Sequence, residues 1–194
     1  MNVGILALQG AFVEHEKILR RLGVRPRQVR LPEDLNDLHG LIIPGGESTT
    51  IGKLAVDYGL VEPLRQFARS TPTWGTCAGM IFLAKDIGMD RQPILGVMDI
   101  TVNRNAFGRQ LDSFEADLTV QGLAGGPFHA VFIRAPIVTQ TGANVEILAA
   151  LDDGTIVAVQ QGHLLATAFH PELTGDERLH EYFLKRIQAI TTAS

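Results

Sequence analysis

Thr73-Trp74-Gly75-Thr76-Cys77-Ala78-Gly79 is the stretch that indicates the fold most clearly. A short extended run ends at Thr76, and an apolar run of helical character, residues 80–84, begins directly after it. Cys77 lies at the junction between two glycines, in the G-x-nucleophile-x-G pattern of a strand-to-helix elbow. Glycines are needed there because the turn is too tight for side chains beside the nucleophile. The pattern predicts an elbow that holds the sulfur in a cleft.

Two interpretations of Cys77 are open at this point. In an elbow, the N–H groups and the dipole of the following helix would favour the thiolate, which is the reactive form of cysteine. A lone cysteine is otherwise a small buried hydrophobic side chain. The flanking glycines and the motifs described below favour the nucleophile.

Upstream of the elbow, strand-like apolar runs alternate with amphipathic helical segments. Strands are expected over Val3–Leu8, Arg25–Arg30 and Leu38–Ile43, and helices over Phe12–Leu22, Thr49–Tyr58 and Val61–Arg69. This alternation predicts an α/β fold: a doubly wound, mostly parallel sheet flanked by helices, of flavodoxin-like type. Ligands bind beyond the carboxyl ends of strands in such sheets. The turns at Gln9, Gly45-Gly46 and Cys77 would all lie at that edge.

Downstream of about residue 95 the pattern changes to short strand-like runs separated by turn signals. The runs are Val97–Val102, Phe114–Val120, Ala130–Ile133, Val145–Leu151, Ile156–Gln161 and Leu164–Phe169. Turn pairs such as Asp153-Gly154 and Gln161-Gly162 predict hairpins, and hence a mixed, partly antiparallel extension of the sheet. A last helix is expected over about Gly175–Ile190, and the whole chain, residues 1–194, is expected to form one domain.

Composition excludes several classes of function. The 194 residues are 45% hydrophobic and 20% charged with net charge −4, which indicates a globular protein and gives no sign of nucleic-acid or membrane binding. The single cysteine excludes an internal disulfide and fits a reducing compartment. No signal peptide or membrane-spanning run is recognisable, so we expect a cytoplasmic protein. No cluster has metal-ligand spacing, so no metal is predicted.

His170-Pro171-Glu172 supplies the partners that a thiol nucleophile needs, a base and a group to orient it. Because Pro171 favours an extended conformation at His170, the His170 and Glu172 side chains should project the same way. His170 would be the general base and acid, and Glu172 would hold its tautomer. The alternative is a capped turn before a helix. The remaining histidines lack such a partner and are interpreted as surface or packing residues: His15, His39, His129, His163 and His180.

Pro44-Gly45-Gly46-Glu47-Ser48 follows a predicted strand. Adjacent glycines let the backbone turn N–H groups toward a ligand. Together with the Ala78 N–H, such groups could stabilise the oxyanion formed when Cys77 attacks a carbonyl. The alternative is a helix entry with Ser48 or Thr49 as the N-cap.

These three motifs together resemble the class I, triad-type glutamine amidotransferases. Further segments are similar to the family of glutaminase subunits of pyridoxal 5′-phosphate synthases. They are Leu8–Gly10, Gly45–Thr50, Arg104–Gln110, Asp112–Glu115 and Phe132–Pro136.

The resemblance implies a reaction without a cofactor. L-Glutamine would be hydrolysed through a thioester on Cys77, and the ammonia would pass to a separate synthase subunit. The resemblance places substrate contacts at Gly46, Glu47, Ser48, Arg104, Ile133 and Arg134, and an oxyanion hole at Gly46 and Ala78. Charge-assisted binding of the substrate α-carboxylate by arginine is physically reasonable, although the sequence does not decide among Arg104, Arg109 and Arg134.

The resemblance also places Gln9-Gly10 and the Gly45–Gly46 turn near the surface that faces the synthase subunit. Docking would fix the orientation of the Gly45–Gly46 peptide, so Gln9, Gly10 and Gly45 are expected to couple the partner to catalysis. The competing hypotheses are a self-sufficient cysteine hydrolase of γ-glutamyl substrates and a non-catalytic protein that kept the fold. An intact Cys77, His170 and Glu172 argues against the second.

Overall fold

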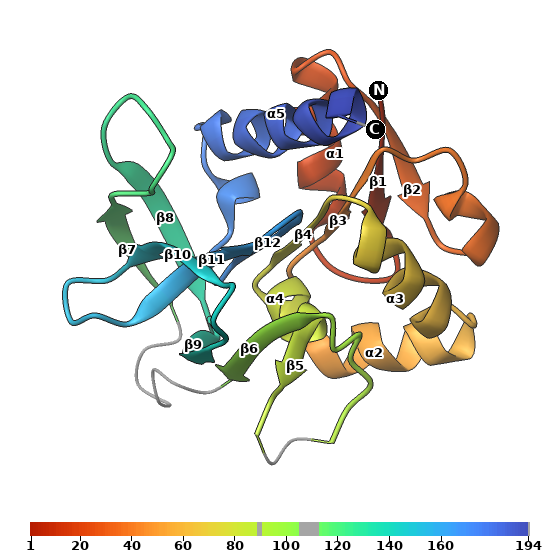
Figure 1. The fold of residues 1–194 in the computed structure, drawn as a ribbon, viewed down its shortest axis with the longest axis horizontal. Helices are drawn as coiled ribbons and strands as arrows, with labels where there is room; N and C mark the ends of the chain where they lie inside the picture. The colour runs from red at the N-terminus through yellow and green to blue at the C-terminus, as the bar shows by residue number, and fades with distance from the viewer. Residues whose placement is uncertain (89–90, 105–112, 194) are drawn as a thin grey trace.

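The computed structural model describes residues 1–88, 91–104 and 113–193 (Figure 1). Arg109 and Asp112, which belong to segments that carry the family resemblance, therefore lie outside the described residues.

The centre of the fold is a parallel sheet with the strand order β2-β1-β3-β4-β12. These strands span Asn2–Leu6 (β1), Arg25–Val29 (β2), Gly40–Ile43 (β3), Thr73–Thr76 (β4) and Leu164–Thr167 (β12). Each neighbouring pair runs parallel, so all carboxyl ends meet at one edge. The doubly wound sheet predicted from the alternating runs is confirmed.

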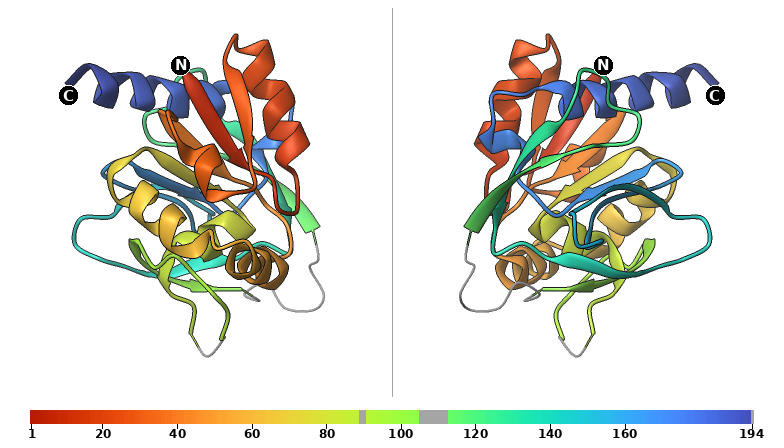
Figure 2. Two further views of the ribbon diagram at one scale, coloured as in Figure 1. Left: turned by 90° about the vertical axis from the view of Figure 1, so that its right-hand side faces the viewer. Right: turned by 90° about the vertical axis from the view of Figure 1, so that its left-hand side faces the viewer.

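Helices cover both faces of this sheet (Figures 1 and 2). One face carries α1 (Phe12–Arg21) and α5 (Arg178–Ala193), and the other carries α2 (Ser48–Asp57), α3 (Val61–Ser70) and α4 (Ala78–Leu83). Short 3₁₀ turns occur at η1 (Pro32–Leu35) and η2 (Pro171–Leu173). No helix among the described residues is long and apolar enough to cross a membrane.

Beyond β12 the sheet continues mostly with antiparallel pairing, as the hairpin signals predicted, whereas the pair at its far edge is parallel. Its further strands are Ala84–Asp86 (β5), Met98–Asn103 (β6), Ile137–Thr141 (β9), Glu146–Ala150 (β10) and Ile156–Gln161 (β11). Two of them, β5 and β9, were not predicted. The runs near residues 114–133 were expected to extend the main sheet, but β7 (Ser113–Leu118) and β8 (Phe128–Ile133) form a separate two-stranded sheet.

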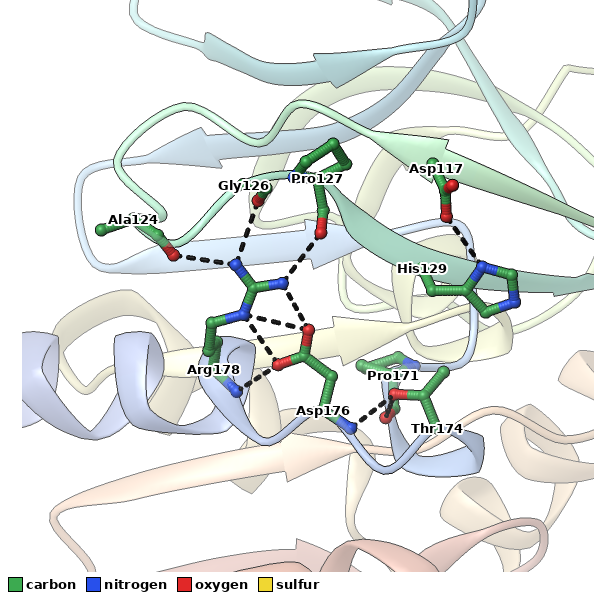
Figure 3. Close-up of polar contacts among 9 residues, drawn as sticks. All are labelled: Asp117, Ala124, Gly126, Pro127, His129, Pro171, Thr174, Asp176 and Arg178. Atoms are coloured by element: carbon green, nitrogen blue, oxygen red, sulfur yellow. Dashed lines mark hydrogen bonds and ion pairs between the residues drawn. The ribbon is translucent and has the colours of Figure 1, made fainter.

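Aromatic packing and one arginine attach this small sheet to the rest of the molecule. Phe132 stacks on Phe114, with ring centroids 4.4 Å apart, and meets Phe169 edge to face. Arg178, at the start of α5, pairs with Asp176 and donates hydrogen bonds to three carbonyl groups of the β7–β8 loop (Figure 3). The planar guanidinium can serve several acceptors at once. The small sheet is thereby held beside the carboxyl edge of the main one.

Candidate active site

Cys77 lies at a sharp turn between β4 and α4, as the glycine pattern predicted. Its backbone has φ 47° and ψ −104°, a strained conformation for a residue with a side chain. A Cβ atom on Gly75 would approach the Gly79 carbonyl carbon to 2.5 Å, and one on Gly79 would approach that of Ile43 to 2.9 Å. Both positions therefore require glycine, and the elbow holds the thiol at the carboxyl edge of the sheet.

His170 and Glu172 meet, but not by the expected geometry. Pro171–Leu173 is a 3₁₀ turn that begins directly after His170, although no side chain caps it, so the segment is both a turn and the source of the pair. The extended arrangement inferred from Pro171 is wrong, because the chain turns there instead of continuing β12. His170 Nδ1 lies 2.6 Å from Glu172 Oε1, which leaves Nε2 for the hydrogen bond with Cys77.

The charge state of His170 follows from these contacts. Burial lowers the pKa of His170, but hydrogen bonds to Cys77 and Glu172 outweigh it and raise the pKa to about 10. The imidazole is therefore protonated at neutral pH. A cationic imidazole beside a cysteine favours the thiolate and holds a proton that a leaving group can take.

A cavity of about 460 Å³ opens in front of this group. Every residue to which the family resemblance assigned a substrate contact lines it, along with the triad thiol and imidazole: Gly46, Glu47, Ser48, Cys77, Ala78, Arg104, Ile133, Arg134 and His170. Ile81 also lines it and was missed in the sequence. Its position four residues after Cys77, one helical turn along α4, could have indicated this.

Glu47 is the N-cap of α2, where Ser48 or Thr49 had been considered. Its carboxylate accepts hydrogen bonds from the backbone N–H groups and the hydroxyls of Thr49 and Thr50. These bonds, led by those from the two hydroxyls, lower the pKa of Glu47 to about 2. A fixed negative charge therefore lines the cavity, 3.7 Å from the Arg104 guanidinium.

The β1–α1 turn packs against the Gly45–Gly46 turn. The Ala11 N–H donates to the Gly45 carbonyl at 3.0 Å, and the Glu47 N–H donates to Gln9 Oε1 at 2.8 Å. Gly10 has φ +100°, and a Cβ there would overlap the Gly45 carbonyl group. The family resemblance had grouped Gln9, Gly10 and Gly45, and all three lie where these two turns meet.

The remaining histidines were expected to lack a carboxylate partner, and this is wrong for His129 and His15. His129, on the surface, pairs with Glu115 and Asp117. His15 and His180 are buried against each other, and His15 also approaches Glu172. The sequence did contain a signal that His15 is buried. His15 precedes Ile18 and Leu19 by one helical turn, so it lies on the buried stripe of α1. Among the described residues, no group of three or more His, Cys, Asp or Glu side chains could hold a metal ion.

The parallel strands have the order β2-β1-β3-β4-β12, a cysteine lies at the elbow after β4, and a His–Glu pair follows β12. This combination of fold and site defines a class I glutamine amidotransferase. Comparison with known families narrows the assignment. Residues 5–189 match the model of the SNO glutamine amidotransferase family, and the chain belongs to that family.

Similar proteins agree with this assignment. The chain is 65% identical over 188 residues to the "Pyridoxal 5′-phosphate synthase subunit PdxT" of Herpetosiphon aurantiacus, covering 95% of this chain and 99% of the relative. It is 60% identical to the protein of the same name from Roseiflexus sp., with the same coverage. A crystal structure described as a glutamine amidotransferase superposes with a TM-score of 0.90 at 54% identity, covering 96% of this chain and 98% of that one.

A more distant structure shows the fold alone. A crystal structure of a putative GMP synthase protein from Thermoplasma acidophilum superposes with a TM-score of 0.72 at 15% identity, covering all of this chain and 95% of that one.

Proposed function

We propose that this chain is the glutaminase subunit of a pyridoxal 5′-phosphate synthase, which releases ammonia from L-glutamine for a synthase subunit. The observation that carries the proposal is the alignment of Cys77, His170 and Glu172 at a cavity that also presents a carboxylate and two guanidinium groups. The names of the 65% and 60% identical relatives support the same assignment.

The first half of the reaction forms a thioester. The Cys77 thiolate attacks the carboxamide carbon of glutamine, and the carbonyl oxygen takes up negative charge. The N–H groups of Gly46 and Ala78 stabilise this oxyanion; Ala78 is the first residue of α4, so its N–H has no acceptor within the helix. As the C–N bond breaks, His170 gives its proton to the departing nitrogen and ammonia leaves.

The second half regenerates the enzyme. Neutral His170 removes a proton from water, the hydroxide attacks the thioester carbon, and glutamate leaves as the Cys77 thiolate re-forms beside protonated His170. Glu172 keeps the imidazole in one tautomer throughout, since its carboxylate accepts from Nδ1.

Recognition of glutamine uses both signs of charge in the cavity. The ionised Glu47 binds the substrate ammonium group, while Arg104 and Arg134 bind the α-carboxylate. Gly46, Ser48 and Ile133 complete the substrate contacts.

Coupling to the synthase subunit runs through the turn contact of Gln9, Gly10 and Gly45. Docking would bias the orientation of the Gly45–Gly46 peptide, which decides whether an N–H faces the oxyanion. A reducing compartment such as the cytoplasm suits a catalytic thiol.

The test measures ammonia release from L-glutamine with and without the synthase subunit, for the wild type and for Cys77→Ala. We expect ammonia only from the wild type with its partner. Cys77→Ala should still support pyridoxal phosphate synthesis when ammonium salt is supplied. Full activity without the partner would favour a self-sufficient γ-glutamyl hydrolase, and no ammonia under either condition would refute a glutaminase.

A further inference from the structure

The carboxylate of Glu172 is buried, and His170 accounts for only one of its oxygen atoms. Oε1 receives the His170 Nδ1–H at 2.6 Å. The side chain of Glu172 is fully buried, and Oε2 has no hydrogen-bond partner among the described residues within normal geometry. Nε2 of His15 approaches Oε2 to 3.4 Å. Burying a carboxylate costs free energy unless its oxygens are hydrogen-bonded or paired, so the approach of His15 calls for an explanation.

His15 is itself held on every side. It lies on α1 and is fully buried, with Nδ1 2.9 Å from Nε2 of His180 on α5. The edge of its ring meets Trp74, and Thr76 Oγ1 lies 3.4 Å from Nε2. These neighbours leave Nε2 directed at Thr76 and Glu172. Figure 1 shows α1 and α5 side by side over one face of the sheet. Trp74 and Thr76 project from that face, because Trp74 packs against His15 and His180, and Thr76 Oγ1 approaches His15.

One pair of tautomers satisfies this network best. With the proton on His15 Nδ1, Nε2 could accept only from the Thr76 hydroxyl, and His180 would carry a buried Nδ1–H without an acceptor among the described residues. The lone pair of His15 Nε2 would also face the carboxylate, which is repulsive. With the proton on Nε2, His15 donates toward Glu172, and its Nδ1 accepts the Nε2–H of His180. His180 Nδ1, which is buried and has no partner among the described residues, is then a bare lone pair and not an unsatisfied donor.

Both rings are neutral in this arrangement. Burial, followed by repulsion from His180 and His170, lowers the pKa of His15 well below its usual value. Burial and the Arg21 charge lower the pKa of His180 to about 3. A neutral donor orients the Glu172 carboxylate without neutralising it, so its negative charge remains available to the His170 imidazolium.

We propose that His15 is a positioning residue for glutamine hydrolysis: its Nε2–H holds the second oxygen of Glu172, and His180 fixes the tautomer that makes this possible. The proposal rests on the proposed glutaminase function. The 3.4 Å separation fits such a role, because hydrogen bonds in catalytic groups often shorten only when substrate is bound.

The experiment compares three variants of His15 in the complete chain, assayed for ammonia release with the synthase subunit present. His15→Leu removes the donor while remaining apolar and bulky. His15→Gln can place an amide N–H where Nε2 lies, whereas the shorter His15→Asn reaches only the Nδ1 position. His163→Leu is the matched control, because His163 bonds a backbone carbonyl, that of Ala68, away from the triad.

We expect His15→Leu and His15→Asn to lower kcat by about tenfold to a hundredfold, the value of a hydrogen bond to a charged group, with KM nearly unchanged. His15→Gln should recover kcat to within about fivefold of the wild type, and His163→Leu should match the wild type. In a Glu172→Gln background, His15→Leu should cost little more, since both changes disable the same element.

Other results would overturn the inference. Wild-type kcat in His15→Leu would remove His15 from the reaction. Equal losses in all three variants, with a lowered melting temperature, would make His15 a packing residue only. If His15→Leu lowered kcat as much in the Glu172→Gln background as in the wild type, His15 would act through a group other than Glu172. A wild-type protein that releases no ammonia would instead refute the proposed function.

Discussion

A methyl group added at Gly45 would test how closely His170 must be confined. Gly45 follows β3 at the carboxyl edge of the sheet, and its Cα faces the imidazole. A Cβ atom there would lie 2.9 Å from His170 Nδ1, closer still to Cε1, and 3.2 Å from Cys77 Cβ. Because nonbonded carbon atoms pack at about 3.5–4.0 Å, Gly45→Ala must displace the ring by about 1 Å.

The magnitude follows from that displacement. A misplacement of about 1 Å in a catalytic group can cost about 10²-fold in rate. The ring is a side chain that can withdraw, so the protein should still fold, with a loss of about 1–3 kcal/mol from overpacking. We expect kcat to fall about a hundredfold while KM stays near the wild-type value, because the residues that bind the two charged groups of glutamine are untouched.

Two assays separate the local effect from partner docking. The first is ammonia release at saturating glutamine with the synthase subunit. The second is alkylation of Cys77 by iodoacetamide without it, which should slow because the displaced imidazolium no longer supports the thiolate. Gly175→Ala is the control, since a Cβ at Gly175 meets nothing within 4 Å. Gly45→Ala with kcat within threefold of the wild type would refute the reasoning.

Three further predictions concern the same site. His170→Asn should approach complete loss of ammonia release, whereas Glu172→Gln should retain more activity because it only loosens the imidazole; equal losses in folded proteins would give Glu172 a role beyond orientation. Gln9→Ala should reduce activation by the synthase subunit by up to about 10²–10³-fold, the value of one oxyanion donor, and unchanged activation would remove Gln9 from the coupling. Because folding raises the pKa of His170 from 6.5 to about 10, protonated His170 contributes its full share to the free energy of unfolding below about pH 6.5. This contribution is lost as the pH rises through 10. The melting temperatures of wild type and His170→Asn should therefore converge over that interval, and parallel curves would contradict the assignment.

Local signals in the sequence predicted the elbow and the central sheet well. Neighbouring backbone approaches Gly75 and Gly79 so closely that only glycine fits at either position, and this requirement appears in the sequence as a short motif. The strands β5 and β9 were missed for equally local reasons. Residues 139–141 of β9 are polar and exposed, and β5 follows α4 at once with no glycine or proline to mark the change.

Contacts between distant segments could not be predicted in the same way. His15 and Glu172 meet only because α1 packs over the carboxyl end of the sheet, and nothing in either neighbourhood specifies the other. The helical stripe of α1 could indicate that His15 is buried, but not what it touches. The Glu47 cap was missed because serine and threonine, which follow it, are the more usual capping residues.

The attachment of β7 and β8 by Arg178 has a consequence for how the cavity opens. An isolated two-stranded sheet is only marginally stable in water, so this unit depends on the guanidinium contacts and on the Phe132 packing. β8 ends at Ile133, and Arg134 follows it, so one wall of the cavity belongs to the unit. Segments of this kind undergo local unfolding at lower free energy than a central sheet, and their amide hydrogens exchange with solvent sooner. A ligand that binds only the closed wall slows that exchange by the factor 1 + L/Kd, where L is the free ligand concentration, so the exchange rate falls in proportion to the unoccupied fraction. The β7–β8 amides, more than those of the parallel core, therefore report whether the cavity holds glutamine.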